Sequence, residues 1–276
     1  MVQNSSKWFK MVQYCSVLLL TILVVACEVI PENDRLIPIE TEETNRKILL
    51  VEFSGVNCNN CPTAAEEGHK LQHLYGKKLV IVEMHPASNA LTNGGKKYDY
   101  TCPEADEYYK AWGLSILPAG VINMTTSNGS YHVPYQKWGA VYQQAAKKIS
   151  PIEIEQQIEI DDHNNLLIDA EIQNLYQDEL NLTCIVWLTE DSIVGAQVLP
   201  DGKKTTEYQR NHLMRDAITE TWGEEINLQP SKSVNVKWNY TLPENVVAKN
   251  CNIVCIVLKD NEAIQVNEYK LNKIIK

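Results

Sequence analysis

Residues 51–62 read Val-Glu-Phe-Ser-Gly-Val-Asn-Cys-Asn-Asn-Cys-Pro and contain a pair of cysteines three positions apart. The apolar run 47–53 predicts a buried strand, and residues 64–75 are rich in helix formers. Cys58 and Cys61 therefore lie between the end of a strand and the start of a helix. Unpaired amides and the positive end of the helix dipole favour a thiolate there, which is the attacking form of cysteine. A second thiol one turn later can then displace a mixed disulfide within the same molecule.

Strand and helix patterns continue to alternate up to about residue 150, which is typical of an α/β unit. The Asn-Gly pair at 128–129 suits the tight turn of a hairpin. The predicted elements are a strand at 79–84, a polar insertion or mobile loop at 86–103, a helix at 104–112, a hairpin of 119–124 with 131–133, and an amphipathic helix at 135–149.

After Ser150-Pro151 the apolar period changes to two, as Ile152, Ile154 and Ile158 illustrate. Short runs of this kind recur with turn-rich connections, which indicates a β-sandwich. The sequence therefore predicts a domain boundary near residue 150. The predicted strands are 152–160, 168–173, 182–188, 234–240, 251–258 and 263–269.

The N-terminus carries an export signal. Lys7 and Lys10 form a basic opening, and the apolar run 17–26 ends on a small residue before Cys27. The run is shorter than the ~20 residues that a membrane-spanning helix needs. Val-Val-Ala-Cys at 24–27 resembles the bacterial lipobox, which implies cleavage of residues 1–26 and lipid modification of Cys27. The polar, acidic segment 27–45 reads as a tether.

Charge and cysteine content narrow the partners and the compartment. The formal net charge of -10 becomes -12 once residues 1–26 leave, because that segment carries two lysines and no acid. Such a surface repels nucleic acid, so we expect no nucleic-acid partner. Six cysteines would remain besides Cys27, and in an oxidising envelope they can form disulfides. Cys102 could exchange with the Cys58/Cys61 pair or stay a solitary thiol.

The other three cysteines lie in the predicted sandwich. Cys184, Cys251 and Cys255 share the apolar parity of their strands and are expected in its core. Cys251 and Cys255 cannot bridge each other on one regular strand, since four residues span ~13 Å. Cys184 could reach either one, or all three could be buried free thiols.

A zinc site is one interpretation of the two histidines in the first predicted helix. His69 and His73 lie four positions apart and face one way. Cys61 and His69, however, are separated by ~12 Å of helix rise, too far for one tetrahedral site. We therefore expect two exposed histidines, and neither a metal nor a cofactor. The polar stretch 211–217, Asn-His-Leu-Met-Arg-Asp-Ala, pairs no nucleophile with a base and reads as a solvated strand.

The first half resembles the thioredoxin superfamily in three features together. Val51-Glu52-Phe53 places an acid six residues before Cys58, residues 112–118 (Trp-Gly-Leu-Ser-Ile-Leu-Pro) resemble the segment before the family's cis-proline, and a hairpin and helix follow. The resemblance implies that Cys58 is the nucleophile, Cys61 the resolving thiol, Glu52 the proton shuttle and Pro118 a cis residue beside the substrate. The family's usual tryptophan is Asn57 here and its Gly-Pro is Asn-Asn, so no redox potential or substrate is implied.

The whole mature chain, roughly residues 27–276, resembles the twenty-eight-kilodalton outer membrane protein family of Bacteroidetes. The lipobox, residues 51–62, the Pro118 segment, the β-rich second half and residues 211–217 near Trp222-Gly223 carry the resemblance. It implies an outer-membrane lipoprotein of α/β plus all-β class, with a thioredoxin-like domain at 46–150 and an immunoglobulin-like β-sandwich at 151–276. Asp191-Ser192-Ile193 also resembles a short O-glycosylation motif of such envelope proteins, which predicts an exposed turn at Ser192.

Two functions fit these features. One is thiol-disulfide exchange on exported proteins by the Cys58/Cys61 pair. The other is a surface binding or adhesion module in which the same pair is a structural disulfide. In both, the lipid on Cys27 would attach the protein to the outer membrane, on its periplasmic side or at the cell surface.

Overall fold

Two nearly continuous apolar strands start the fold. β1 (Ile48–Phe53) and β2 (Leu79–Met84) are buried at every position, and each is apolar except for one glutamate. Strands covered on both faces need such runs and show no alternation. β1 and β2 pair in parallel, with Ile48 opposite Leu79. A parallel pair requires a crossover connection, and α2 (Cys61–Tyr75) supplies it.

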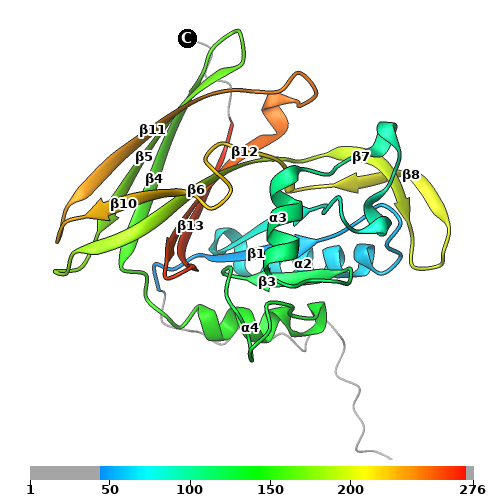
Figure 1. Cartoon of the computed structure of the whole chain (residues 1–276), viewed down its shortest axis with the longest axis horizontal. Coiled ribbons are helices and arrows are strands. Elements are labelled where there is room, and N and C mark those ends of the chain that lie inside the picture. The colour runs from blue at the N-terminus through cyan, green and yellow to red at the C-terminus, as the bar shows by residue number, and fades with distance from the viewer. Residues whose placement is uncertain (1–43, 272–276) are drawn as a thin grey trace, which may run out of the picture. The chain divides into compact units, whose positions relative to one another are not determined.

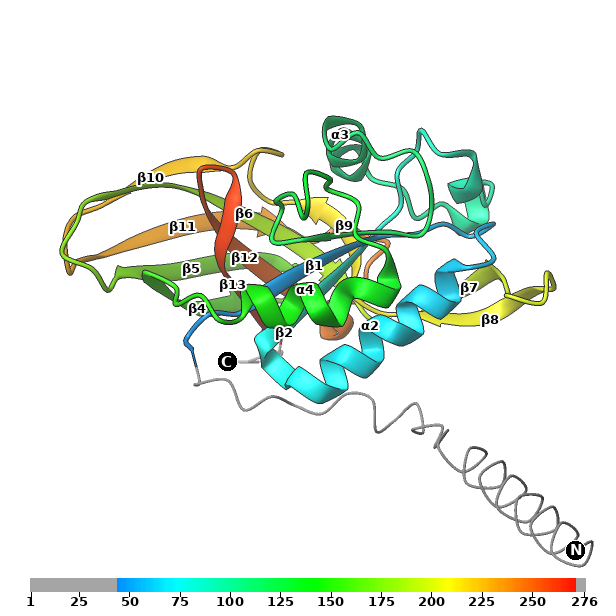
Figure 2. The same ribbon diagram turned by 90° about the horizontal axis from the view of Figure 1, so that it is seen from below.

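The computed structural model describes residues 44–271 (Figures 1 and 2). The expected signal peptide, Cys27 and nearly all of the expected tether lie outside these residues. The remaining elements in chain order are α3 (Pro103–Ala111), β3 (Ala119–Ile122), α4 (Trp138–Ala145), β4 (Ile152–Ile160), β5 (Asn165–Asn174), β6 (Leu180–Glu190), β7 (Ile193–Val198), β8 (Lys204–Arg210), β9 (Leu213–Ala217), β10 (Glu224–Leu228), β11 (Ser233–Thr241), β12 (Cys251–Lys259) and β13 (Glu262–Lys270).

One eight-stranded sheet contains strands from both halves of the chain. Its order is β13-β12-β6-β9-β2-β1-β3, and β10 also pairs with β6. β9 joins the halves, because it lies antiparallel to β6 and meets β2 in parallel where Glu83 pairs with Leu213. Strands before and after residue 150 therefore hydrogen-bond to one another. The domain boundary near residue 150 stays a prediction.

Helices cover both faces of this sheet around β1. Figure 2 shows α3 on one side of β1, and α2 and α4 on the other. The side chains of Val51 and Phe53 belong to a core shared with Tyr108 of α3 and Trp187 of β6. Glu52, which lies between them in sequence, points to the opposite face because side chains alternate along a strand. This alternation brings Glu52 to the α2 face.

A second core lies between the large sheet and a three-stranded sheet ordered β11-β5-β4. β4 and β5 alternate buried and exposed residues, as expected for strands with one face in water. Their buried side chains, such as Ile154 and Ile168, share a cluster with Leu182 of β6 and Ile253 of β12. The protein is thus a mixed α/β structure, mostly β, with several sheets. β7 and β8 form a separate two-stranded hairpin.

Two predicted elements of the first half differ in the structure. The hairpin keeps β3 as one arm, but the other arm is reduced to an isolated bridge between Gly120 and Val133. The helix expected at 135–149 is a short 3-10 turn at Tyr135–Lys137 followed by α4, which ends at Ala145. The helix therefore ends four residues before the predicted end at residue 149.

Candidate functional site

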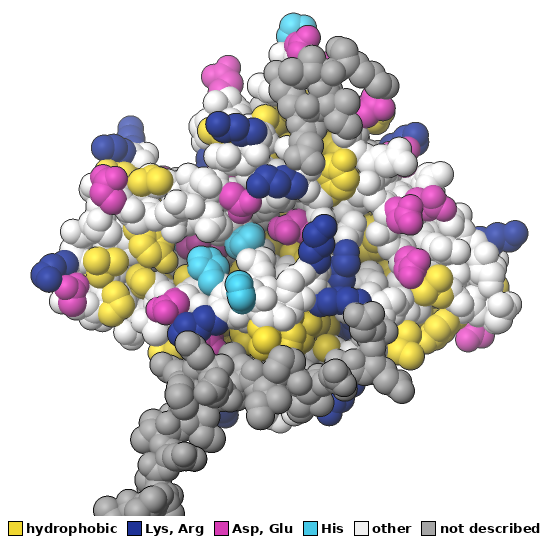
Figure 3. All heavy atoms as spheres, turned by 180° about the vertical axis from the view of Figure 1, so that it is seen from behind, with side chains coloured by type: hydrophobic (Ala, Val, Ile, Leu, Met, Phe, Trp, Pro, Cys, Tyr) yellow, Lys and Arg dark blue, Asp and Glu magenta, His cyan; other side chains and the backbone are white. Residues whose placement is uncertain are grey.

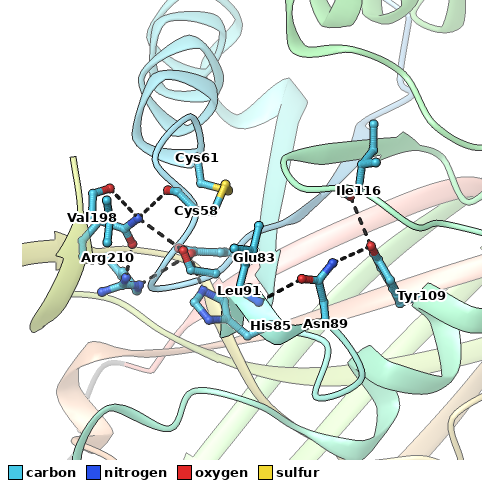
Figure 4. Close-up of a disulfide and its surroundings, with 12 residues drawn as sticks. Cys58, Cys61, Glu83, His85, Asn89, Leu91, Tyr109, Ile116, Val198 and Arg210 are labelled. Carbon is cyan, nitrogen blue, oxygen red and sulfur yellow. Dashed lines mark hydrogen bonds and ion pairs between the residues drawn. A yellow bond between two sulfur atoms is a disulfide. The ribbon is translucent and has the colours of Figure 1, made fainter. Parts of the chain in front are cut away.

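The paired cysteines lie at the N-terminus of α2. Cys58 and Cys61 form a disulfide with an S–S distance of 2.03 Å, and Cys61 is the first residue of the helix (Figure 4). Pro62 occupies the first turn, where its missing amide hydrogen costs no helical bond. Both cysteines are buried, at 2% and 1% exposure, whereas Asn59 and Asn60 between them are exposed. The helix places the pair next to its positive end, where a thiolate is stabilised.

Glu52 is a buried acid on the α2 face. It is 3% exposed, and its Oε1 has no hydrogen-bond partner among residues 44–271. Burial, reinforced by the negative charge of Glu83, holds the pKa of Glu52 well above its usual range. Its Oε2 would lie 3.8 Å from a Cβ added to Gly68. Gly68 follows Cys61 by seven positions on the same helix, about 10 Å of helix rise.

The region 86–103 packs against the cysteine loop. Asn57 N donates to the carbonyl of Leu91 at 2.8 Å. Asn89 Nδ2 donates to Tyr109 Oη at 2.9 Å, and Tyr109 Oη donates to the carbonyl of Ile116 at 3.3 Å (Figure 4). This region contains two 3-10 turns, Ala90–Thr92 and Lys96–Tyr98, and its mobility stays a prediction. It connects the cysteine loop with the segment before Pro118.

The Pro118 segment lies beside the same loop. The Leu117–Pro118 peptide bond is cis. A Cβ added to Gly55 would lie 2.7 Å from the carbonyl oxygen of Leu91 and 3.1 Å from Leu117 Cδ1. Glycine at position 55 therefore permits both segments to approach the chain three residues before Cys58. Ile116 and Leu91 are partly exposed there, at 56% and 39%.

A hairpin from the second half of the chain holds the cysteine loop from another side. Gln197 of β7 donates from Nε2 to the carbonyls of Cys58 at 2.8 Å and Gly55 at 3.2 Å. Val198 N donates to the carbonyl of Val56 at 2.8 Å. Gln197 belongs to no recognisable sequence motif, so this contact could not be predicted from the sequence. Its role becomes visible through the tertiary structure.

Arg210, at the end of β8, anchors the hairpin to β2. It is 1% exposed, and its Nη2 donates to the carbonyl of Ala196 at 2.9 Å and to Gln197 Oε1. Its guanidinium lies 4.7 Å from the centre of the Tyr100 ring, and its Nε lies 3.6 Å from Glu83 Oε1. The arginine therefore spans the distance between the hairpin and a second buried acid.

Glu83 and His85 form a buried hydrogen bond on β2 and just after it. His85 Nε2 lies 2.8 Å from Glu83 Oε1 (Figure 4). Burial alone would raise the pKa of Glu83, but the hydrogen bond from His85 and the charge of Arg210 outweigh it and lower that pKa. Burial lowers the pKa of His85. A neutral His85 that donates a hydrogen bond to an ionised Glu83 agrees with the lowered pKa of each group.

A small cavity adjoins both acids. It measures about 10 Å³, room for about one water molecule. Its lining includes Glu52, Ala65, His69, Glu83, Tyr208 and Arg210. Ala65, one helical turn after Cys61, is the lining residue of α2 that comes nearest to the cysteine pair in sequence.

The histidines of α2 are exposed. Figure 3 shows histidine side chains grouped beside acidic ones on the face opposite to that of Figure 1. His69 and His73 are both exposed, as predicted, and burial of part of the His69 ring lowers its pKa. Within residues 44–271, no group of three or more His, Cys, Asp or Glu side chains is placed to hold a metal ion.

The interpretation of residues 211–217 as a solvated strand is wrong. Leu213 and Met214 of β9 are 0% and 1% exposed, because β9 lies inside the large sheet between β6 and β2. His212 Nδ1 lies 3.6 Å from Asp191 Oδ1 and 3.8 Å from Glu268 Oε1. Burial alone would lower the pKa of His212, but Glu268 and Asp191 outweigh it and raise that pKa. The side chains of His212, Asp191 and Glu268 are 13–26% exposed, so this charged group is partly shielded from water.

The remaining cysteines are buried. Cys102 is 5% exposed, and burial raises the pKa of its thiol to about 12, which disfavours exchange with Cys58 or Cys61. Cys184, Cys251 and Cys255 lie in the second core, as their parity predicted, and are free thiols in the described part of the chain. The Sγ atoms of Cys184 and Cys255 are 3.7 Å apart. Ser192 is exposed in the connection between β6 and β7, with φ of 63°.

Comparison with known proteins gives a family and a fold. The family model described as Outer membrane protein Omp28 matches residues 105–274, a range that begins after the cysteine pair. HBP35 of Porphyromonas gingivalis has a TM-score of 0.64 at 13% identity, over 84% of this chain and 80% of that chain. A domain of the outer membrane lipoprotein Omp28 from the same organism is 24% identical, with a TM-score of 0.33, over 46% of this chain and 92% of that chain. No curated protein matches the chain.

The likeness to HBP35 shows that the fold of most of this chain also occurs in that protein. In the described part of the chain, no helix is both long enough and apolar enough to cross a membrane.

Proposed function

Because this chain belongs to the Outer membrane protein Omp28 family, we propose that it is an outer-membrane lipoprotein whose Cys58/Cys61 pair exchanges disulfides with exported proteins. The observation that carries the proposal is the position of the pair. The disulfide lies at the first residue of α2, and Gly55, three positions before it, is approached by the Leu91 and Leu117 segments. In this arrangement Cys58 can form a mixed disulfide with a polypeptide, and Cys61 can then attack that disulfide and release the polypeptide.

The proposed chemistry balances as two successive exchanges. In the reduced protein, the Cys58 thiolate attacks one sulfur of a substrate disulfide, forms a mixed disulfide and releases a substrate thiolate. Cys61 then gives up its proton toward Glu52 and attacks the Cys58 sulfur, which releases the second substrate thiolate. Two electrons pass from the cysteine pair to the substrate, and the reverse sequence oxidises a substrate dithiol.

A thioredoxin-like first half and an immunoglobulin-like second half belong to the same proposal. Support for the first comes from the parallel β1-α2-β2 unit, the Cys-X-X-Cys pair at the helix start and the cis bond before Pro118. Support for the second comes from the two sheets that enclose one core. In this proposal Pro118 lies beside the bound substrate, as the resemblance implies.

The proposed attachment to the membrane is through Cys27. Two or three acyl chains on that residue would hold the mature chain firmly, since each buried methylene contributes ~0.8 kcal/mol. The outer membrane is the location that the family's description gives. Exported proteins are the proposed partners on the periplasmic side, and a surface ligand would be the partner at the cell surface. Ser192 is a proposed O-glycosylation site because its turn is exposed.

Cys61→Ala is expected to trap Cys58 in mixed disulfides with exported proteins. Without the resolving thiol, the second exchange cannot occur, so the intermediate accumulates. The measurement is non-reducing electrophoresis of envelope fractions from cells that express the variant, followed by mass spectrometry of the Cys58 adducts. The matched control is Cys102→Ala, which removes a buried thiol outside the pair and should leave the adduct pattern of the wild type unchanged.

The alternative function is a surface binding module with a structural disulfide, and the burial of both sulfurs favours it. In that case Cys61→Ala would give no adducts, and the wild type would neither reduce nor oxidise a model dithiol. Both results together would reject thiol-disulfide exchange.

A further inference from the structure

Two glutamates occupy equivalent positions on neighbouring strands. Glu52 of β1 and Glu83 of β2 are register partners in the parallel pair, so their side chains leave the sheet on the same face. Both are buried, at 3% and 7% exposure, and both adjoin the cavity along α2. Two neighbouring carboxylates in a buried site repel each other, so one of them is expected to be ionised and the other to keep its proton.

The surroundings of the two acids are indeed different. Glu83 Oε1 accepts from His85 Nε2 at 2.8 Å and lies 3.6 Å from Arg210 Nε. Glu52 Oε1 has no hydrogen-bond partner in the described chain. Glu83 is therefore stabilised as a carboxylate, and Glu52 as a neutral acid.

The titratable groups that face Glu52 come from every element packed around it. α2 contributes His69, β2 contributes Glu83, β8 contributes Tyr208 and Arg210, and the turn after β8 contributes His212. Burial and the two carboxyl groups raise the pKa of Tyr208, which stays neutral. Glu83 is thus the nearby anion, and its field adds to the effect of burial in keeping the proton on Glu52.

Hydrogen bonds connect this acid pair with the cysteine loop. Arg210 Nη2 donates to Gln197 Oε1, and Gln197 Nε2 donates to the carbonyl of Cys58 at 2.8 Å. Gln197 therefore contacts both the carbonyl of Cys58 and the guanidinium that lies beside Glu83. The β7–β8 hairpin, from the second half of the chain, supplies both of these residues.

We propose that Glu83 is a positioning residue of the redox site: a carboxylate, held by His85 and Arg210, that keeps the neighbouring Glu52 protonated in the disulfide form, so that Glu52 can give its proton to the Cys61 thiolate that forms when the disulfide is reduced. Arg210 and Gln197 couple this charge arrangement to the position of Cys58. This inference rests on the proposed thiol-disulfide exchange, but the protonation of Glu52 can be measured without any turnover.

Glu83→Gln is expected to shift the titration of Glu52 to lower pH. The measurement is an infrared titration of the carboxylic-acid carbonyl band in the disulfide form of the purified chain, with Glu52→Gln to assign the band by its loss. Glu83→Asp, which restores the anion, should return the titration toward that of the wild type. Glu66→Gln, on the exposed surface of α2, is the matched control and should leave it unchanged.

The same variants are then compared in reduction of the disulfide by dithiothreitol as a function of pH. The part of the rate–pH profile that is due to titration of Glu52 should be lost in Glu52→Gln. In Glu83→Gln the same part should move to lower pH. Gln197→Glu keeps an acceptor for Arg210 but loses the donor to the carbonyls of Gly55 and Cys58, and we expect a reduction rate slower by at least about fivefold, since one lost hydrogen bond accounts for about that factor.

An unchanged Glu52 band in Glu83→Gln would overturn the inference. If that variant does not fold, the wild-type spectrum tests the inference. The infrared band of protonated Glu52 has to be present at neutral pH, and a spectrum without it contradicts the inference. If the band shifts as expected but neither the wild type nor any variant exchanges thiols with a model substrate, the proposed function falls while the charge arrangement stands.

Discussion

Arg210→Met is expected to lower the free energy of unfolding by about 3–5 kcal/mol, because it leaves a buried carboxylate without its cation. Arg210 is 1% exposed and lies 3.6 Å from Glu83. The variant also removes the donor to Ala196 O and the contact with the Tyr100 ring. Urea unfolding followed by tryptophan fluorescence gives the loss directly.

The control for this prediction is Lys204→Met on the same strand, an exposed residue whose replacement should change stability by less than about 0.5 kcal/mol. The double variant Arg210→Met/Glu83→Gln should cost less than the sum of the two single variants, because no unpaired charge remains buried. A cost below about 1 kcal/mol for Arg210→Met would contradict the view that the hairpin and β2 are joined by a buried ion pair.

Trp187→Ala is expected to cost about 3–5 kcal/mol, since it opens a cavity in a core. Trp187 belongs to β6 in the second half, is fully buried and lies in the core that contains Val51 and Phe53 of β1. Its ring centre is 5.5 Å from that of Tyr108 in α3. The two halves should therefore lose stability together, in one transition measured by calorimetry.

Trp222→Ala is the matched control. Trp222 also contacts the Tyr108 ring, at 5.0 Å between centres, but it is 48% exposed and leaves a smaller cavity. We expect less than half of the loss caused by Trp187→Ala. A Trp187→Ala protein in which the second half melts alone, with α3 and β1 unaffected, would show that the shared core is not cooperative.

The elements that depend on local pattern could be predicted from the sequence. The apolar runs of β1 and β2, the helix after Cys61 and the alternation in β4 all appear where the sequence placed them. Each of these patterns reflects burial that the element's own residues determine. The family was also identified correctly from sequence.

Contacts between distant segments could not be predicted in this way. β9 lies inside the large sheet although residues 211–217 are rich in polar groups, with Leu213 and Met214 buried and His212 near the carboxylates of Asp191 and Glu268. Gln197 and Arg210 reach the cysteine loop through tertiary structure alone. One feature of the sequence does point to a contact with Glu83. β2, like β1, carries a single glutamate in an otherwise apolar strand, and a buried charged group is normally paired with another group.

The reduction potential of the Cys58/Cys61 pair tests thiol-disulfide exchange by this protein most directly. The purified chain is equilibrated in glutathione buffers of graded ratio, its thiols are alkylated, and the reduced fraction of the pair is measured by mass spectrometry. A pair that exchanges disulfides with proteins should titrate between about −120 and −270 mV. A potential below about −300 mV would indicate a structural disulfide and would contradict thiol-disulfide exchange by this pair.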